Sequence, residues 1–127
     1  MTYELTEHGV KVSHTVINHD SVVMPYCVGG HPAFNCPVFE NESFEDYIVE
    51  FEQPENAACA QLTEDGLINN ADRVSVLENE AVIPVRHSLF YKDALVFDAL
   101  KSRKVALKHK KTGHGILVSF PDFDYLG

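Results

Sequence analysis

Apolar and polar residues alternate along much of the chain with a period of two, which is typical of β-strands. Residues 9–18 show this alternation, with Val10, Val12, His14 and Val16 on one face. The polar segment 18–21 separates them from a second apolar run, residues 22–28. This arrangement predicts that residues 9–18 and 22–28 form a hairpin.

The same pattern recurs in later segments. In residues 47–52, Tyr47, Val49 and Phe51 share one face. Residues 88–100, in contrast, fit no single period, and this indicates short helical turns around a strand. Many short strands joined by turns, without a long amphipathic helix, predict an all-β fold, a β-sandwich. The other expected strands are 57–63, 67–70, 73–77, 81–85, 104–111 and 115–120, with turns at 64–66 and 112–115.

Length, charge and hydropathy limit the number of domains and the kinds of partner that the protein can have. The 127 residues suggest a single domain, residues 1–127. The net charge of −9 argues against nucleic-acid binding, and the basic residues of segment 101–111 are expected on the solvated face of a strand. No apolar run is long enough for a membrane span, and the first residues lack the features of a signal peptide. These features predict a cytoplasmic protein without a membrane partner.

The three cysteines are Cys27, Cys36 and Cys59. An odd number without a secretion signal predicts reduced thiols. Cys27, His31 and Cys36 have a C-x3-H-x4-C spacing, but structural zinc sites use closer pairs and a second pair downstream. We therefore expect small buried apolar cysteines and no metal site.

The segment Gly29-Gly30-His31-Pro32 interrupts the strand pattern. Its glycines permit positive φ angles and the close approach of a ligand, and Pro32 restricts His31 to extended geometry. His31 is a candidate general acid, although a histidine in such a place can also simply hydrogen-bond a loop. Four other histidines are expected to be exposed: His8, His19, His109 and His114.

The run from Cys27 to Asn35, CVGGHPAFN, resembles the histidine motif of the aldose 1-epimerase (galactose mutarotase-like) family, in its LacX-type branch. Four further segments resemble the same family in the same order, and together the five cover nearly the whole chain. These segments are DYIVEFE (46–52), LFYKDALVF (89–97), SRKVAL (102–107) and FPDFDYLG (120–127).

The resemblance implies a galactose mutarotase-like supersandwich, of which this chain would be the central to C-terminal part. Members of the family are roughly twice as long, within the size of one large sandwich. They carry a first active-site histidine before the segment that matches Met1 and a general-base glutamate after the one that matches Gly127. The resemblance therefore predicts a partial domain with impaired activity.

The family interconverts the α and β anomers of a hexose by ring opening, which needs a proton donor and a proton acceptor. The resemblance implies that His31 is the acid and that Asp93 binds a sugar hydroxyl, with Asn35 and Phe34 shaping the pocket. The reaction requires no cofactor and no metal. Three residues near the chain end form a weaker group of candidates: Asp122, Asp124 and Tyr125.

Two other functions remain open. Many β-sandwiches bind carbohydrate through aromatic and polar side chains without turnover, so a non-catalytic carbohydrate-binding module is the alternative to an isomerase. Part of a sandwich also leaves sheet edges and apolar surface uncovered, and such edges pair with other chains. We therefore expect a homo-oligomer, with a hexose or related sugar as the small-molecule partner.

Overall fold

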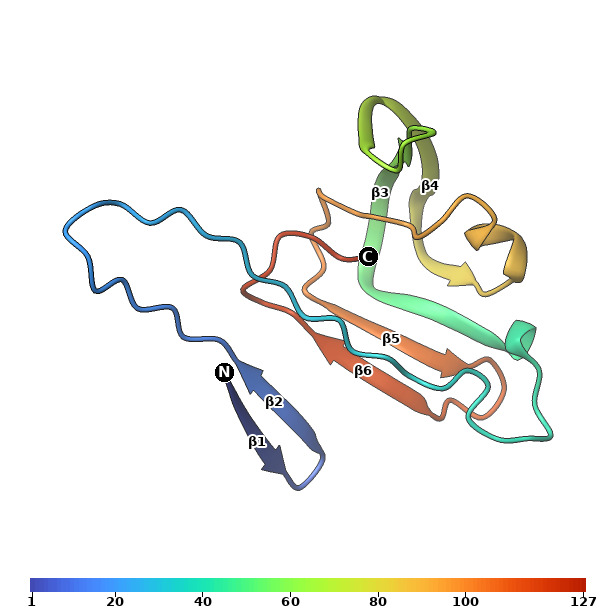
Figure 1. Cartoon of the computed structure of the whole chain (residues 1–127). Coiled ribbons are helices and arrows are strands. Elements are labelled where there is room, and N and C mark those ends of the chain that lie inside the picture. The colour runs from blue at the N-terminus through green and yellow to red at the C-terminus, as the bar shows by residue number, and fades with distance from the viewer. The chain divides into compact units, whose positions relative to one another are not determined.

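The computed structural model describes residues 1–127, which divide into two compact units, residues 1–33 and residues 34–127 (Figure 1). The fold is all-β with two antiparallel sheets, as predicted for part of a β-sandwich. Its helices are two short 3-10 turns, η1 (Phe44–Asp46) and η2 (His87–Phe90). Neither is long and apolar enough to cross a membrane. That both units belong to one partial domain stays a prediction.

The first unit contains a two-stranded hairpin of β1 (Thr2–Thr6) and β2 (Gly9–Ser13). The predicted hairpin of residues 9–18 with 22–28 is wrong, because β2 pairs with the strand before it and residues 22–28 form no strand. The short loop between β1 and β2 explains why these two strands pair. Only two residues separate Thr6 from its partner Gly9, and such a short loop closes a hairpin with little loss of chain entropy.

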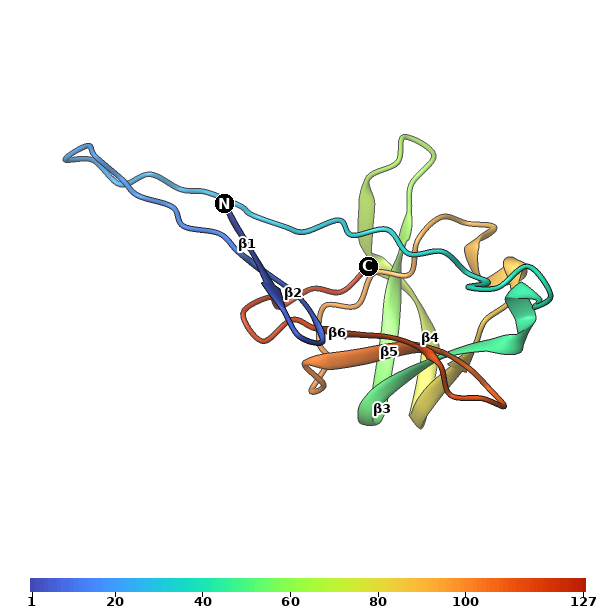
Figure 2. The same ribbon diagram turned by 90° about the horizontal axis from the view of Figure 1, so that it is seen from below.

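The second unit contains a four-stranded antiparallel sheet with the order β4-β3-β5-β6 (Figures 1 and 2). Residues 47–51 of β3 pair with β5, and from Glu55 onward β3 pairs with β4 alone. Figure 1 shows that β3 and β4 bend together and continue away from β5 as a long hairpin. The strands are β3 (Tyr47–Leu62), β4 (Ile68–Pro84), β5 (Lys104–His109) and β6 (Gly115–Ser119).

The bend in β3 explains why the sequence predicts two strands where the structure has one. The pairing of β3 with β4 shifts register between Glu50 and Glu55, as in a β-bulge. Pro54 lies in this interval and has no N–H group to give to a neighbouring strand. β4 likewise joins three predicted strands into one, with shifts in register along it.

The core of the second unit lies at this bend. Tyr47 and Phe51 are buried as the alternating pattern predicts, with exposed fractions of 0% and 3%. Phe51 meets Phe97 edge to face, with ring centroids 5.6 Å apart. Phe97 also forms an isolated bridge with Leu126, so the irregular segment 88–100 contains one short helix and one bridge, close to its prediction. The other core residues are Cys59, Leu77, Ile83, Leu100, Val105 and Phe120.

β5 and β6 form the hairpin that the sequence predicts. Its loop closes through a hydrogen bond from the N–H of His109 to the carbonyl oxygen of His114, 2.8 Å long. Gly113 has φ +76°, a backbone conformation that glycine adopts without strain. This loop brings two histidines close together near the start of β3.

Candidate functional site

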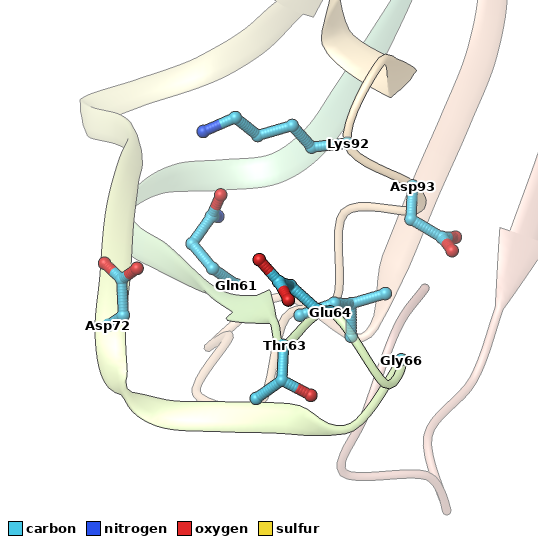
Figure 3. A pocket seen from close by; sticks show the side chains of 8 residues that line it. Gln61, Thr63, Glu64, Gly66, Asp72, Lys92 and Asp93 are labelled. Carbon is cyan, nitrogen blue, oxygen red and sulfur yellow. The ribbon is translucent and has the colours of Figure 1, made fainter.

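An open cavity of about 520 Å³ lies where the β3–β4 hairpin meets the segment that follows η2 (Figure 3). Polar side chains dominate its lining, and they come from β3, from the turn after it, from β4 and from residues 92–93. The lining residues are Gln61, Leu62, Thr63, Glu64, Gly66, Asp72, Lys92 and Asp93. A concave surface with several hydrogen-bonding groups suits a small polar ligand.

Residues 64–66 form a turn at one side of the cavity, as the sequence predicts. The N–H of Gly66 donates to the carbonyl oxygen of Thr63 at 2.9 Å, and the N–H of Thr63 donates to that of Leu67 at 2.8 Å. Gly66 has φ +77°, which a glycine tolerates and a larger residue adopts with strain. The turn therefore holds Thr63 and Glu64 at a fixed place beside the cavity.

Asp93 is the predicted site residue that lines this cavity. Its backbone has φ +86°, an uncommon conformation for a residue with a side chain, and its N–H donates to the carbonyl oxygen of Phe90 at 3.2 Å. One carboxylate oxygen accepts the N–H of Ala94 at 2.6 Å. Asp93 is an exposed residue, and Figure 3 shows its carboxylate directed away from the other labelled side chains of the cavity.

The charged groups around the cavity are mostly acidic. Figure 3 shows Lys92 reaching across the cavity above Gln61 and Glu64, whereas the carboxylate of Asp93 points away from Asp72. Three carboxylates and one amide carbonyl supply hydrogen-bond acceptors, and Lys92 and the amide NH₂ of Gln61 supply donors. Such a mixture matches sugar hydroxyls, which both donate and accept.

The structure does not bring the other predicted site residues into this cavity. His31 is exposed and belongs to the first unit, in a segment without regular secondary structure. Neither Gly29 nor Gly30 has the positive φ that the sequence permits. Phe34 and Asn35 begin the second unit, both are exposed, and neither lines the cavity. Their roles stay predictions.

The cysteines differ from their prediction. Cys59 is buried as expected, but Cys27 is exposed and Cys36 is half-buried, and the segment that carries these two cysteines forms no strand. No group of three or more His, Cys, Asp or Glu side chains is arranged to hold a metal ion.

A second polar cluster was missed by the sequence reasoning. His109 is buried and His114 half-buried, against the prediction that both are exposed. Their rings stack with centroids 5.1 Å apart, beside Glu42 and the hydroxyl of Tyr47. The period-two pattern of β5 carried a signal for His109, because it lies two residues after Leu107 and four after the buried Val105.

The hydrogen bond between Tyr47 and Glu42 changes the pKa of both side chains in this cluster. Burial alone raises the pKa of the Glu42 carboxyl, but hydrogen bonds from Tyr47, the N–H of Phe39 and His114 outweigh burial, so this pKa lies below its ordinary value. Burial and the hydrogen bond to Glu42 raise the pKa of the Tyr47 phenol. At neutral pH the pair is therefore a carboxylate and a phenol.

Comparison with known proteins places the chain in a family. A family model described as aldose 1-epimerase matches residues 1–126. Two curated relatives from Lactococcus lactis subsp. lactis, the plasmid and chromosomal forms of protein LacX, are each 40% identical over 128 aligned positions, which cover 99% of this chain. The chain spans 43% of the length of these relatives. No solved structure matches the chain. The match over residues 1–126 shows that the chain belongs to the aldose 1-epimerase family.

Proposed function

We propose that the protein binds an aldose and takes part in interconverting its α and β anomers. The observation that carries this proposal is the position of Asp93 on a polar cavity, in a chain of the aldose 1-epimerase family. Asp93 would accept a hydrogen bond from a sugar hydroxyl. Gln61, Glu64 and Lys92 offer further donors and acceptors within the same cavity.

His31 is proposed as the general acid. Ring opening of a hemiacetal needs a proton at the ring oxygen while a base removes the proton of the anomeric hydroxyl. An imidazole suits the first task because it exchanges a proton near neutral pH. The exposed side chain of His31 is accessible to a ligand. Phe34 and Asn35, three and four residues further on, are proposed to contact the sugar.

Polarimetry of freshly dissolved α-D-glucose or α-D-galactose tests the reaction, and NMR titration with the same sugars tests binding. We expect Asp93→Asn to weaken sugar binding about tenfold, because a hydrogen bond to a charged acceptor is replaced by a weaker one. Asp65→Asn is the matched control, since Asp65 lies in the adjacent turn but does not line the cavity. Equal affinity of the Asp93→Asn and Asp65→Asn proteins would refute the role of Asp93.

His31→Gln tests the acid separately. We expect sugar affinity to stay within about twofold while any acceleration of mutarotation is lost, because glutamine cannot transfer a proton. His19→Gln is the control, because His19 is also exposed and lies in the same unit. An unchanged rate in the His31→Gln protein would remove His31 from the mechanism.

The alternative is a non-catalytic carbohydrate-binding module. The polar cavity supports it as well as it supports an enzyme, since binding alone needs only hydrogen-bonding groups and a concave surface. Sugar binding that depends on Asp93, combined with no acceleration of mutarotation by the unmodified protein or by the longest available gene product, would favour this alternative.

Self-association is proposed on the basis of uncovered strands. β4 and β6 are the edges of the four-stranded sheet, and Leu117 on β6 has an exposed fraction of 64%. Edges of this kind pair with other chains. Sedimentation equilibrium at micromolar concentration should detect a dimer or larger assembly, and a clean monomer would contradict the proposal.

A further inference from the structure

β6 is one of the two edge strands of the four-stranded sheet, and one side of its backbone has no partner strand (Figure 1). Toward β5, the N–H of Phe120 donates to the carbonyl oxygen of Arg103 at 2.9 Å. At the other end of the strand, the N–H of His109 donates to the carbonyl oxygen of His114 at 2.8 Å. These two bonds fix which residues of β6 face β5, because successive residues of an antiparallel strand bond alternately to one side and to the other.

The alternation assigns each backbone group of β6 to one side of the strand. Every second residue from His114 to Phe120 bonds toward β5. The residues between them, Gly115, Leu117 and Ser119, therefore direct their N–H and C=O groups away from β5. β6 has no second neighbour, so no strand of this chain uses these groups. An unpaired row of this kind is a template for another strand.

The two edges of the sheet differ in how they resist pairing with another chain. β4 carries charged side chains such as Arg73 and Glu80, its pairing with β3 shifts register, and it ends at Pro84. Charges, irregular register and proline are features by which edge strands avoid association. β6 has the sequence GILVS, without a charged residue or a proline, and its register with β5 is unbroken. β6 is therefore the edge that is open to a further strand.

The side chains of β6 also favour a further strand. Val118 packs against the core of the second unit. Leu117 points to the opposite face of the sheet, because successive side chains of a strand alternate, and its exposed fraction is 64%. A strand paired with β6 would place a side chain directly beside Leu117, and contact between two apolar side chains across a strand pair stabilises the pairing.

We propose that two copies of this chain pair through β6, antiparallel to each other, about a twofold axis at Leu117. This interface depends on the proposed self-association of the protein, and it specifies the edge and the register. Leu117 of one copy faces Leu117 of the other, and Gly115 faces Ser119 on either side of the axis. These residues are the ones whose backbone groups point outward, so each facing pair exchanges two main-chain hydrogen bonds. The same surface is used by both copies, and the contact closes as a dimer.

The charges beyond the two ends of β6 favour the antiparallel direction. Exposed Lys110 and Lys111 lie in the loop before β6, and exposed Asp122 and Asp124 follow the strand. An antiparallel pair brings the basic loop of one copy beside the acidic segment of the other, at both ends of the interface. A parallel pair would bring like charges together at both ends, which is unfavourable. The net charge of −9 opposes association, so the direction that pairs opposite charges is preferred.

Sedimentation velocity of the full chain at micromolar concentration tests which edge is used. Leu117→Lys puts two like charges face to face at the centre of the interface, so we expect the dissociation constant of the dimer to rise about a hundredfold. Val74→Lys is the matched control, because Val74 is an exposed apolar residue of the other edge strand, β4. It should leave the dimer unchanged. A monomeric unmodified protein would overturn self-association altogether, whereas a Leu117→Lys protein that stays dimeric would overturn only the β6 interface.

Hydrogen exchange of the unmodified chain, resolved by residue, tests the register without any substitution. We expect exchange at the N–H groups of Gly115, Leu117 and Ser119 to slow about tenfold as the concentration rises through the dissociation constant of the dimer, because only the dimer gives them acceptors. The N–H groups of Ile116 and Val118 bond toward β5 and should be protected on both sides of that concentration. Exchange at the three outward groups that does not depend on concentration would refute the interface, even in a protein that sediments as a dimer.

An exchange of charges tests the direction of the two strands. Lys111→Glu should weaken the dimer about fivefold, because a carboxylate then lies beside Asp122 of the other copy at both ends of the interface. Addition of Asp122→Lys to this variant should restore the affinity to within about twofold. Arg86→Glu makes the same change of charge just after β4, the other edge strand, and should leave the affinity unchanged. A combined variant as weak as Lys111→Glu alone would refute the antiparallel arrangement.

Discussion

The backbone N–H of Ser102 donates to Oε1 of Glu55 at 2.6 Å, and the hydroxyl of Ser102 donates to the same oxygen at 2.7 Å. The N–H of Lys101 adds bonds of 3.1 and 3.2 Å to the two carboxylate oxygens. Glu55 is 1% exposed and Ser102 is 0% exposed, so a charged group is buried where β3 bends. The carboxylate thereby fixes the loop that enters β5 against the middle of β3.

Replacement of Glu55 should destabilise this loop. Glu55→Gln puts an NH₂ group where backbone N–H groups need an acceptor, and we expect the free energy of unfolding to fall by about 2–3 kcal/mol. Ser102→Ala removes one of the hydrogen bonds and should lower it by about 1 kcal/mol. Urea unfolding measures both changes. Glu80→Gln is the control, because Glu80 is the exposed register partner of Glu55 on β4.

The same carboxylate predicts a pH dependence of stability. Burial raises the pKa of Glu55, but hydrogen bonds from Ser102 and Lys101 outweigh burial and hold it below its ordinary value of 4.5. Its contribution is complete above pH 4.5 and is lost as the pH falls through the lower pKa of the folded state. The difference in stability between the unmodified and Glu55→Gln proteins should therefore shrink below pH 4.5. A difference that stays constant down to pH 3 would contradict this linkage.

Gly115 permits the close pairing of β5 and β6. A Cβ atom at this position would lie 2.0 Å from the carbonyl oxygen of Leu107 and 2.6 Å from the Cα atom of Lys108. Neither backbone atom can move without disturbing the hairpin, so Gly115→Ala should lower the free energy of unfolding by about 2–3 kcal/mol. Gly9→Ala is the control, because Gly9 also begins a strand and nothing lies within 4 Å of its added Cβ. Equal stability of the two variants would show that the hairpin can move its backbone at Leu107 and Lys108 to accommodate a Cβ atom at position 115.

The sequence predicts well where strands lie in the second unit and poorly how they pair in the first. Alternation in residues 47–51 and 104–109 follows from one buried face, which a local pattern records. No strand was predicted over residues 2–6, which form β1. The alternation in residues 9–18 indicated a strand there, but a period of two does not say which neighbouring segment the strand pairs with. The apolar run 22–28 had the stronger pattern but no partner.

The candidate site shows the same limit. Asp93 was predicted from its segment, and the structure places it at a cavity whose other walls come from β3 and β4, up to 32 residues away in sequence at Gln61. Glu42 could not have been found by pattern, because it lies in an irregular segment and its partner His114 is 72 residues further on. Local spacing predicts chemistry within a motif, whereas these contacts depend on tertiary pairing.

The three cysteines should differ strongly in reactivity toward an exposed-thiol reagent. Cys27 is exposed, Cys36 is half-buried with a raised pKa, and burial raises the pKa of Cys59 to about 11. At pH 8 a thiol with that pKa is ionised to roughly one part in a thousand, and the thiolate is the reactive form. We expect Cys27 to react first and Cys59 only after unfolding, which mass spectrometry of alkylated peptides would measure. Early modification of Cys59 would show that the core at this point is open.

Phe97 connects the core to the end of the chain. Its side chain is 5% exposed and meets Phe51 edge to face, while its backbone exchanges hydrogen bonds of 2.7 and 3.0 Å with Leu126. Phe97→Ala removes the ring and leaves a cavity beside Phe51, so the free energy of unfolding should fall by about 3–5 kcal/mol. Phe97→Leu keeps most of the volume and should lower it by about 1 kcal/mol.

Phe90→Ala separates the loss of packing in the core from the loss of an aromatic ring in general. Phe90 lies seven residues before Phe97, in η2, and is 45% exposed, so its removal creates no closed cavity. In urea unfolding of the three variants, the free energy of unfolding should be far lower for Phe97→Ala than for Phe97→Leu or Phe90→Ala. Similar losses for Phe90→Ala and Phe97→Ala would mean that the bridge to Leu126, which needs only the backbone of Phe97, holds the chain end without the packed ring.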